Sequence, residues 1–216
     1  IRQVWDETND GLETLPKNVD VLVQQIDKAA QVFWSDPKRH KTGRLNLRKA
    51  RYEIFNNGIG LDSQFGEDIR WAIADKCGQL MLEKTTLYPD AISTLNKLRH
   101  NKVKLALVTN GTSTAQRKKI NKFDLENHFD HIQIEGEAGI GKPELGAYKK
   151  ALTALEVKAS ETWMVGDNLE WEVIAPQKLG IFAIWRDPQG DGTLPKNTTA
   201  KPDMIITKLS ELVTGY

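Results

Sequence analysis

From Tyr88 to the C-terminus, short apolar runs alternate with stretches whose apolar residues recur at helical spacing. The alternation predicts strands at 103–108, 131–134, 162–165, 181–185 and 203–207. Helices are predicted between them at 91–98, 114–123, 145–155 and 169–179. Strands that alternate with helices are typical of a parallel sheet with crossover helices. Because such crossovers are right-handed, the sequence predicts an α/β fold with a doubly wound parallel sheet.

The segment from about residue 16 to residue 86 has a different pattern, because its apolar residues follow helical spacing throughout. Pro16 suits the first turn of a helix, and the glycines near residue 60 suit a helix end. No stretch of this segment has the pattern of a strand. Three helices are predicted here, at 16–33, 45–56 and 65–82.

Ligands of doubly wound sheets lie at the carboxyl ends of the strands, so the residues just after each strand are the candidates for a site. Thr109, Asn110 and Gly111 follow the first strand of this region. A threonine hydroxyl and the free amides of a helix N-terminus bind anions, and glycine lets the backbone approach a ligand. Taken alone, helix capping by Thr112 or Ser113 is the favoured interpretation.

Lys142 lies between Gly141 and Pro143, after the strand at 131–134 and just ahead of a helix. A lysine in this place can act on a phosphate as a point charge, and Pro143 stiffens the turn. Taken alone, a solvated lysine is the favoured interpretation, since lysine is seldom buried.

Asp167 and Glu172 follow the strand at 162–165 in the run "GDNLEWEV". A carboxylate at a strand end can hold a hard cation such as Mg²⁺, which keeps waters and uses few protein ligands. A capping role for Asp167 and a solvent-facing Glu172 are the alternatives. Together, a hydroxyl, a lysine and a carboxylate follow three strands of one sheet in order. The combination predicts an anion site beside a metal site.

The composition of the chain excludes several kinds of partner and location. The 216-residue chain has 30 basic and 29 acidic residues and a formal charge of +1, so neither nucleic acid nor a membrane surface is expected as a partner. The single cysteine, Cys77, excludes an internal disulfide and suits a reducing compartment. No run is apolar enough to span a membrane, and no secretory pattern opens the sequence. These features predict a cytoplasmic protein.

The three strand-end motifs, in this order, resemble those of the haloacid dehalogenase (HAD) superfamily of hydrolases. "LALVTNG" is similar to its second motif, "GKPELGAY" to its third, and "WMVGDNLEWEVIAPQKLGIFAIW" to its fourth. The resemblance covers residues 88–212 well, and the helical segment is similar to the small cap of the phosphatase-type members. It implies a Rossmann-like HAD core of residues 1–11 and 87–216 and a helical cap of residues 12–86.

The resemblance also implies an activity, that of a Mg²⁺-dependent phosphatase acting on a small phosphomonoester through an aspartyl-phosphate. Thr109 would bind the phosphoryl oxygens, with Asn110 and Gly111 helping. Lys142 would neutralise charge on the nucleophile and on the phosphoryl group. The physical logic is that a carboxylate nucleophile divides one hard step into two, while positive charges screen the repulsion between two anions.

The metal site is implied by the same resemblance. Asp167 would hold Mg²⁺, and Glu172, where the family more often has Asp, would assist. The substrate would be a small molecule selected by the cap. Arg48 or Arg51 would be placed to reach a substrate anion, although a surface position on a helix is the favoured interpretation for both. The oligomeric state is open.

The family's first motif, D-x-D-x-T/V after the first strand, is not visible. The chain offers "IRQVWDETND", in which "IRQV" resembles the start of that strand and "WDETND" resembles the residues that usually come after the motif. Three interpretations stay open. The protein has residues between Val4 and Trp5 that this sequence lacks, as the absence of an initial Met also suggests; the motif is truly missing; or Asp6 is a divergent nucleophile. The nucleophile is therefore not assigned.

Two other functions are kept as alternatives. A 2-haloacid dehalogenase needs no metal, and "VGDN" with Glu172 argues for the metal-dependent branch instead. A catalytically silent phosphate-binding module is favoured if the first motif is truly missing.

Overall fold

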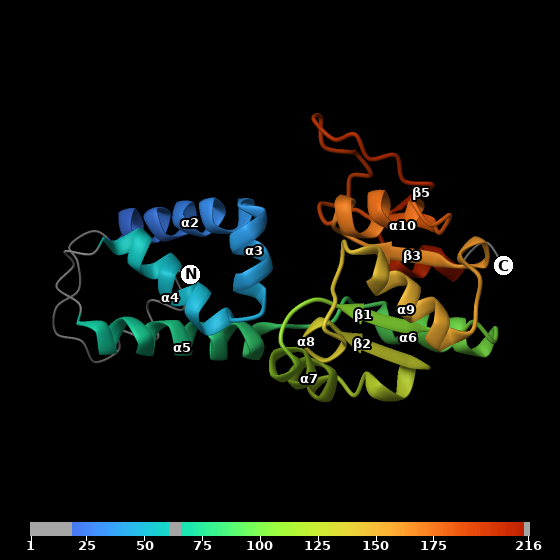
Figure 1. Cartoon of the computed structure of the whole chain (residues 1–216), viewed down its shortest axis with the longest axis horizontal. Helices are drawn as coiled ribbons and strands as arrows, with labels where there is room; N and C mark the ends of the chain where they lie inside the picture. Colours follow the sequence, from blue (N-terminus) through green and yellow to red (C-terminus); the bar gives the residue numbers. More distant parts are fainter. Residues whose placement is uncertain (1–18, 61–65, 214–216) are drawn as a thin grey trace. The chain divides into compact units, whose positions relative to one another are not determined.

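A computed structural model of the chain describes residues 19–60 and 66–213 (Figure 1). The chain divides into two compact units at the boundary between Thr86 and Leu87. We call the described residues up to Thr86 the helical unit and those from Leu87 onward the sheet unit. The predicted core segment at residues 1–11 lies outside the described residues, so the assignment of domains stays a prediction.

The helical unit consists of α-helices over its described length. They are α2 (Val19–Ser35), α3 (Pro37–Arg44), α4 (Leu47–Ile59) and α5 (Glu67–Lys84). The three helices predicted from sequence are confirmed as α2, α4 and α5. The sequence did not predict α3, which begins where the Asp36 carboxylate accepts a hydrogen bond from the Arg39 N–H at 2.8 Å.

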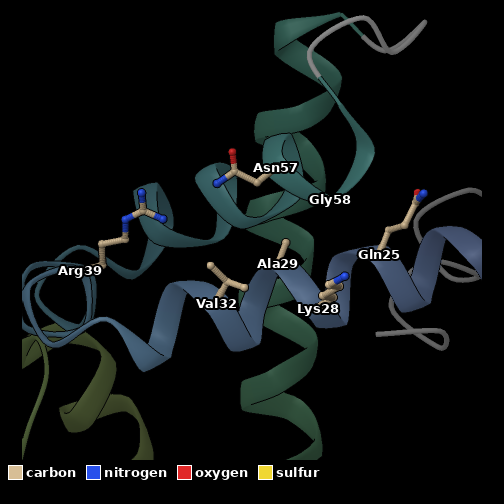
Figure 2. Close-up of a pocket in the computed structure, with 7 residues that line it drawn as sticks. All are labelled: Gln25, Lys28, Ala29, Val32, Arg39, Asn57 and Gly58. Atoms are coloured by element: carbon tan, nitrogen blue, oxygen red, sulfur yellow. The ribbon is translucent and has the colours of Figure 1, made fainter.

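One apolar cluster holds the helical unit together. Buried residues from α2, α4 and α5 pack against one another, among them Leu22, Ile26, Phe33, Ile54, Phe55, Ile73 and Leu80. Gly58 lets α4 approach α2 closely, because a Cβ at this position would lie 2.7 Å from Ile26 Cα. A shallow groove of about 420 Å³ runs along α2 beside α3 and the end of α4, and it contains none of the predicted site residues (Figure 2).

The sheet unit alternates strands and helices as the sequence predicts. Its helices are α6 (Ala91–His100), α7 (Ser113–Lys122), α8 (Glu135–Ala138), α9 (Leu145–Leu155) and α10 (Ala175–Gln177). Its strands are β1 (Ala106–Thr109), β2 (His131–Ile134), β3 (Trp163–Gly166), β4 (Phe182–Arg186) and β5 (Met204–Ile206). Short helical turns join them at Glu126–His128, Ala159–Glu161, Leu169–Ile174 and Leu209–Val213.

All strand pairs among the described residues are parallel, which confirms the predicted α/β fold. β1 pairs with β2 (Figure 1), and β4 lies between β3 and β5. Thr109 lies opposite Ile134 in the first set, and Gly166 lies opposite Trp185 in the second. Residues that follow paired strands therefore meet at the same edge. The first strand expected at Ile1–Val4 lies outside the described residues.

In the sheet unit, two predicted elements differ from the structure by more than two residues, and α8 was not predicted. β1 begins at Ala106 rather than at Val103, because the Val103 N–H bonds to Leu98 O and closes the end of α6 instead. The predicted helix at 169–179 is a wide π-helical turn, Leu169–Ile174, followed by the short α10. Pro176 explains the break, since proline has no N–H for the next regular helical bond.

No helix within residues 19–60 and 66–213 combines the length and the apolar character that a bilayer crossing requires.

Candidate active site

Asn110 joins the end of β1 to the turn before α9. Its Nδ2 donates to the Lys142 carbonyl at 2.6 Å, and its Oδ1 accepts from the Lys142 N–H at 2.8 Å. Gln116 on α7 donates to the Asn110 carbonyl at 2.8 Å. The side chain of Asn110 thus acts on the backbone of Lys142, and two predicted site segments are brought together.

Lys142 extends this contact to the end of β3. Its Nζ donates to Glu172 Oε1 at 2.7 Å, and the two side chains are only 11% and 5% exposed. The other oxygen of Glu172 accepts from the Asn168 N–H at 2.9 Å. Burial raises the pKa of Glu172, while the charge of Lys142 acts in the opposite direction. Lys142 is a fixed, buried positive charge and not the solvated lysine that its residue type alone favours.

Asp167 lies directly after β3 and is exposed. Trp185 on β4 donates from Nε1 to its carbonyl oxygen at 2.8 Å, which fixes the backbone at this point. Its carboxylate has no hydrogen-bond partner among residues 19–60 and 66–213. Gly166 leaves room for the Glu172 side chain, because a Cβ there would lie 2.1 Å from Glu172 Cγ. In the described part of the chain, Asp167 therefore presents a carboxylate without a hydrogen-bond partner, next in sequence to the Gly166 that contacts Glu172.

Thr109 closes β1, and its hydroxyl likewise has no partner in the described part of the chain. Gly111 is held on both sides: its N–H donates to Glu135 Oε2 at 2.9 Å, and its carbonyl accepts from the Gly136 N–H at 2.9 Å. The Gly111 N–H thus already has a hydrogen-bond acceptor within the protein. Thr112 caps α7, its hydroxyl accepting from the Ala115 N–H at 3.2 Å, as the simpler interpretation of this motif proposes.

Of the two carboxylates proposed to bind a metal, that of Asp167 suits a hard cation better than that of Glu172. Mg²⁺ prefers oxygen ligands and keeps several waters, and the free carboxylate of Asp167 fits that requirement. Both oxygens of Glu172 already have protein donors, so its role as a metal ligand stays a prediction. Within the described ranges, no three His, Cys, Asp or Glu side chains form a cluster that could hold a metal ion.

Three further residues support the site and were not identified from sequence. Trp185 holds the Asp167 carbonyl, and Tyr148 donates to the Trp171 carbonyl at 2.5 Å within the turn that carries Glu172. Burial raises the pKa of Tyr148, and the charge of Glu172 adds to this effect. Glu135 is the first residue after β2, so the rule of reading strand ends would have selected it.

The comparisons with known proteins show which family the chain belongs to. A sequence model described as haloacid dehalogenase-like hydrolase matches residues 1–180, and the chain therefore belongs to this family of hydrolases. The resemblance inferred from the three motifs is confirmed.

Two relatives show where the sequence similarity lies. The phosphoserine phosphatase of Thermus thermophilus is 38% identical over 126 residues, which are 58% of this chain and 49% of that protein. The ribulose-1,5-bisphosphate 5-phosphatase of Halopiger xanaduensis is 31% identical over 182 residues, which are 81% of this chain and 75% of that protein. The chain thus spans about half of the first relative and about three quarters of the second.

A solved structure supports the fold. The HAD-hydrolase YfnB of Bacillus subtilis, which was crystallised with magnesium bound, superposes with a TM-score of 0.73 at 20% identity. The superposition covers 98% of this chain and 86% of that chain.

Proposed function

We propose that this chain is a Mg²⁺-dependent phosphatase that hydrolyses a small phosphomonoester through an aspartyl-phosphate intermediate. The observation that carries the proposal is the buried Lys142–Glu172 pair, 2.7 Å long. Thr109 ends β1 and Asp167 follows β3, and neither the hydroxyl nor the carboxylate has a hydrogen-bond partner within residues 19–60 and 66–213. A buried cation and a hydroxyl donor at strand ends suit a phosphoryl group, whose charge the cation would neutralise. The phosphatase names of both relatives support the same substrate class.

Each described residue has a distinct part in the proposed reaction. The Thr109 hydroxyl would donate to a phosphoryl oxygen, and the Lys142 ammonium would lower the repulsion between that group and an incoming carboxylate. Asn110 holds the backbone of Lys142, and Glu172 fixes its ammonium. Asp167 would hold Mg²⁺, which supplies further charge neutralisation when bound. The magnesium bound to YfnB supports this choice of metal.

The proposed reaction requires a nucleophilic aspartate, which the family resemblance would put after the first strand, at residues that the structure does not describe. Tandem mass spectrometry of a tryptic digest across Val4–Trp5 tests whether it exists. A longer peptide with Asp-x-Asp between these residues supports the phosphatase. A contiguous Gln3–Lys17 peptide means that the motif is missing, and it then favours the silent module or Asp6 as the nucleophile.

The activity itself is tested with a panel that contains p-nitrophenyl phosphate, phosphoserine and ribulose-1,5-bisphosphate, each with Mg²⁺ and with EDTA. Release of phosphate that requires Mg²⁺ is the expected result. Release of halide from 2-haloacids in EDTA would indicate the dehalogenase instead. Binding of inorganic phosphate without turnover of any substrate would indicate a silent binding module.

A further inference from the structure

Glu135 is a buried carboxylate for which the proposed reaction has no direct use. It begins α8, immediately after β2, and only 4% of the residue is exposed. A buried carboxylate costs free energy unless hydrogen bonds satisfy it. One of its partners is the N–H of Gly111, which donates to Oε2 at 2.9 Å. The carboxylate is therefore directed at the loop that carries Thr109.

The same carboxylate also lies against the turn that carries Lys142. A Cβ at Gly141 would lie 2.6 Å from Glu135 Oε1 and 2.8 Å from Asn110 Oδ1. Both side chains thus pass directly over the Gly141 Cα, in space that any other residue would occupy. Glu135 contacts the two segments that the proposed phosphate site combines.

We infer that Glu135 is a positioning residue that fixes the loop Thr109–Gly111 against the turn Gly141–Lys142, so that hydroxyl and ammonium face one phosphoryl group. The inference rests on the proposed phosphatase function. Gly111, held by Glu135 at its N–H and by Gly136 at its carbonyl, has little freedom to shift.

The tests use variants that separate geometry from charge. Glu135→Gln keeps an acceptor at the right distance, Glu135→Asp keeps the charge but is shorter by one methylene, and Glu135→Ala removes both. Glu161→Ala, which removes an exposed acid of the same unit, is the control for loss of a carboxylate. In the Ala and Asp variants, kcat/KM should fall about tenfold, chiefly through KM, while Glu135→Gln should stay within about threefold of the wild type.

The pH profile distinguishes a positioning residue from a general acid or base. Glu135→Gln should leave the pH profile of kcat/KM unchanged, because the inferred role requires an acceptor and not a proton transfer. A loss in Glu135→Gln as large as in Glu135→Ala would overturn the inference and assign the charge itself a role.

A measurement without substrate keeps this test separate from the proposed function. Amide hydrogen exchange in ¹⁵N-labelled protein reports the Gly111 and Lys142 N–H groups directly. Both should exchange about tenfold faster in Glu135→Ala, and near the wild-type rate in Glu135→Gln. Unchanged exchange in Glu135→Ala would overturn the inference. If exchange changes as expected but no variant, wild type included, releases phosphate, the proposed function fails while the link between loop and turn stands.

Discussion

Two ion pairs of equal length occupy opposite environments in this chain. Lys142 Nζ and Glu172 Oε1 of the sheet unit lie 2.7 Å apart, with side chains 11% and 5% exposed. Arg48 Nε and Asp75 Oδ1 of the helical unit also lie 2.7 Å apart, with side chains 58% and 52% exposed. Distance alone therefore does not rank the pairs. Burial determines which pair interacts more strongly, because water screens the charges of the exposed pair and hardly screens those of the buried pair.

The largest effect is expected from Lys142→Met. The variant leaves Glu172 buried without its cation and should lower the free energy of unfolding by about 3–5 kcal/mol. It also removes the charge placed for the phosphoryl group, so kcat should fall about a hundredfold or more. Urea denaturation and steady-state kinetics measure the two losses.

Lys158→Met is the matched control for this change. It breaks an exposed pair of the same unit, between Lys158 Nζ and Glu161 Oε1 at 3.6 Å. The expected loss is under about 1 kcal/mol, with kcat unchanged. Equal losses of stability in the two variants would contradict the argument from burial.

The helical unit is expected to depend on apolar packing more than on its ion pair. Gly58→Ala tests this, because the added Cβ would lie 2.7 Å from Ile26 Cα, a backbone atom that cannot move aside cheaply. The overpacked variant should lose about 1–3 kcal/mol of unfolding free energy. Chemical denaturation followed by tryptophan fluorescence measures it.

Gly78→Ala supplies the comparison within the same unit. The atoms nearest to a Cβ at Gly78 belong to the guanidinium end of Arg51, which is flexible, and alanine favours a helix by up to about 1 kcal/mol. The variant should be neutral or more stable. A Gly58→Ala protein as stable as Gly78→Ala would show that α2 and α4 separate at little cost.

The same contrast explains how much the sequence could predict. The order of the strands along the chain and, to within one residue, the ends of the strands before Thr109, Lys142 and Asp167 followed from periodicity, so these three residues could be proposed as candidates without a structure. What those side chains contact did not follow, because hydrogen-bond partners such as Asn110 and Lys142 are 32 residues apart. Sequence likewise could not show that Glu172 uses both oxygens within the protein or that Glu135 is buried. These features depend on tertiary packing rather than on local pattern.

Glu137 offers a smaller effect that depends on pH. Its hydrogen bond with Arg117 and, to a smaller extent, its hydrogen bond with Ser113 lower its pKa from 4.5 to about 2. Because the folded pKa is below the unfolded one, the pairing stabilises the folded protein above pH 4.5. That contribution is lost as the pH falls from 4.5 toward 2. Urea midpoints between pH 7 and pH 3 should thus fall less steeply in Glu137→Gln than in the wild type.

The size of the Glu137 effect is limited by solvent, since its side chain is 34% exposed. We expect under about 1 kcal/mol at pH 7, and less at high salt. Glu126→Gln, which alters the longer 3.4 Å contact of Arg117, is the control and should leave the slope unchanged. Identical slopes in wild type and Glu137→Gln would remove the assigned role of this pair.

The smallest effect is expected for Arg48 and Asp75, although their contact is bidentate, with hydrogen bonds of 2.7 and 2.9 Å. A double-mutant cycle with Arg48→Ala and Asp75→Ala isolates their coupling, which should be about 0.2–1 kcal/mol and should shrink in high salt. Arg48 also lies 4.4 Å from the centroid of the Trp71 ring, so Arg48→Ala should cost more than Asp75→Ala. A coupling near that of a buried pair would mean that exposure does not govern these two interactions, and the comparison between the two units would lose its physical basis.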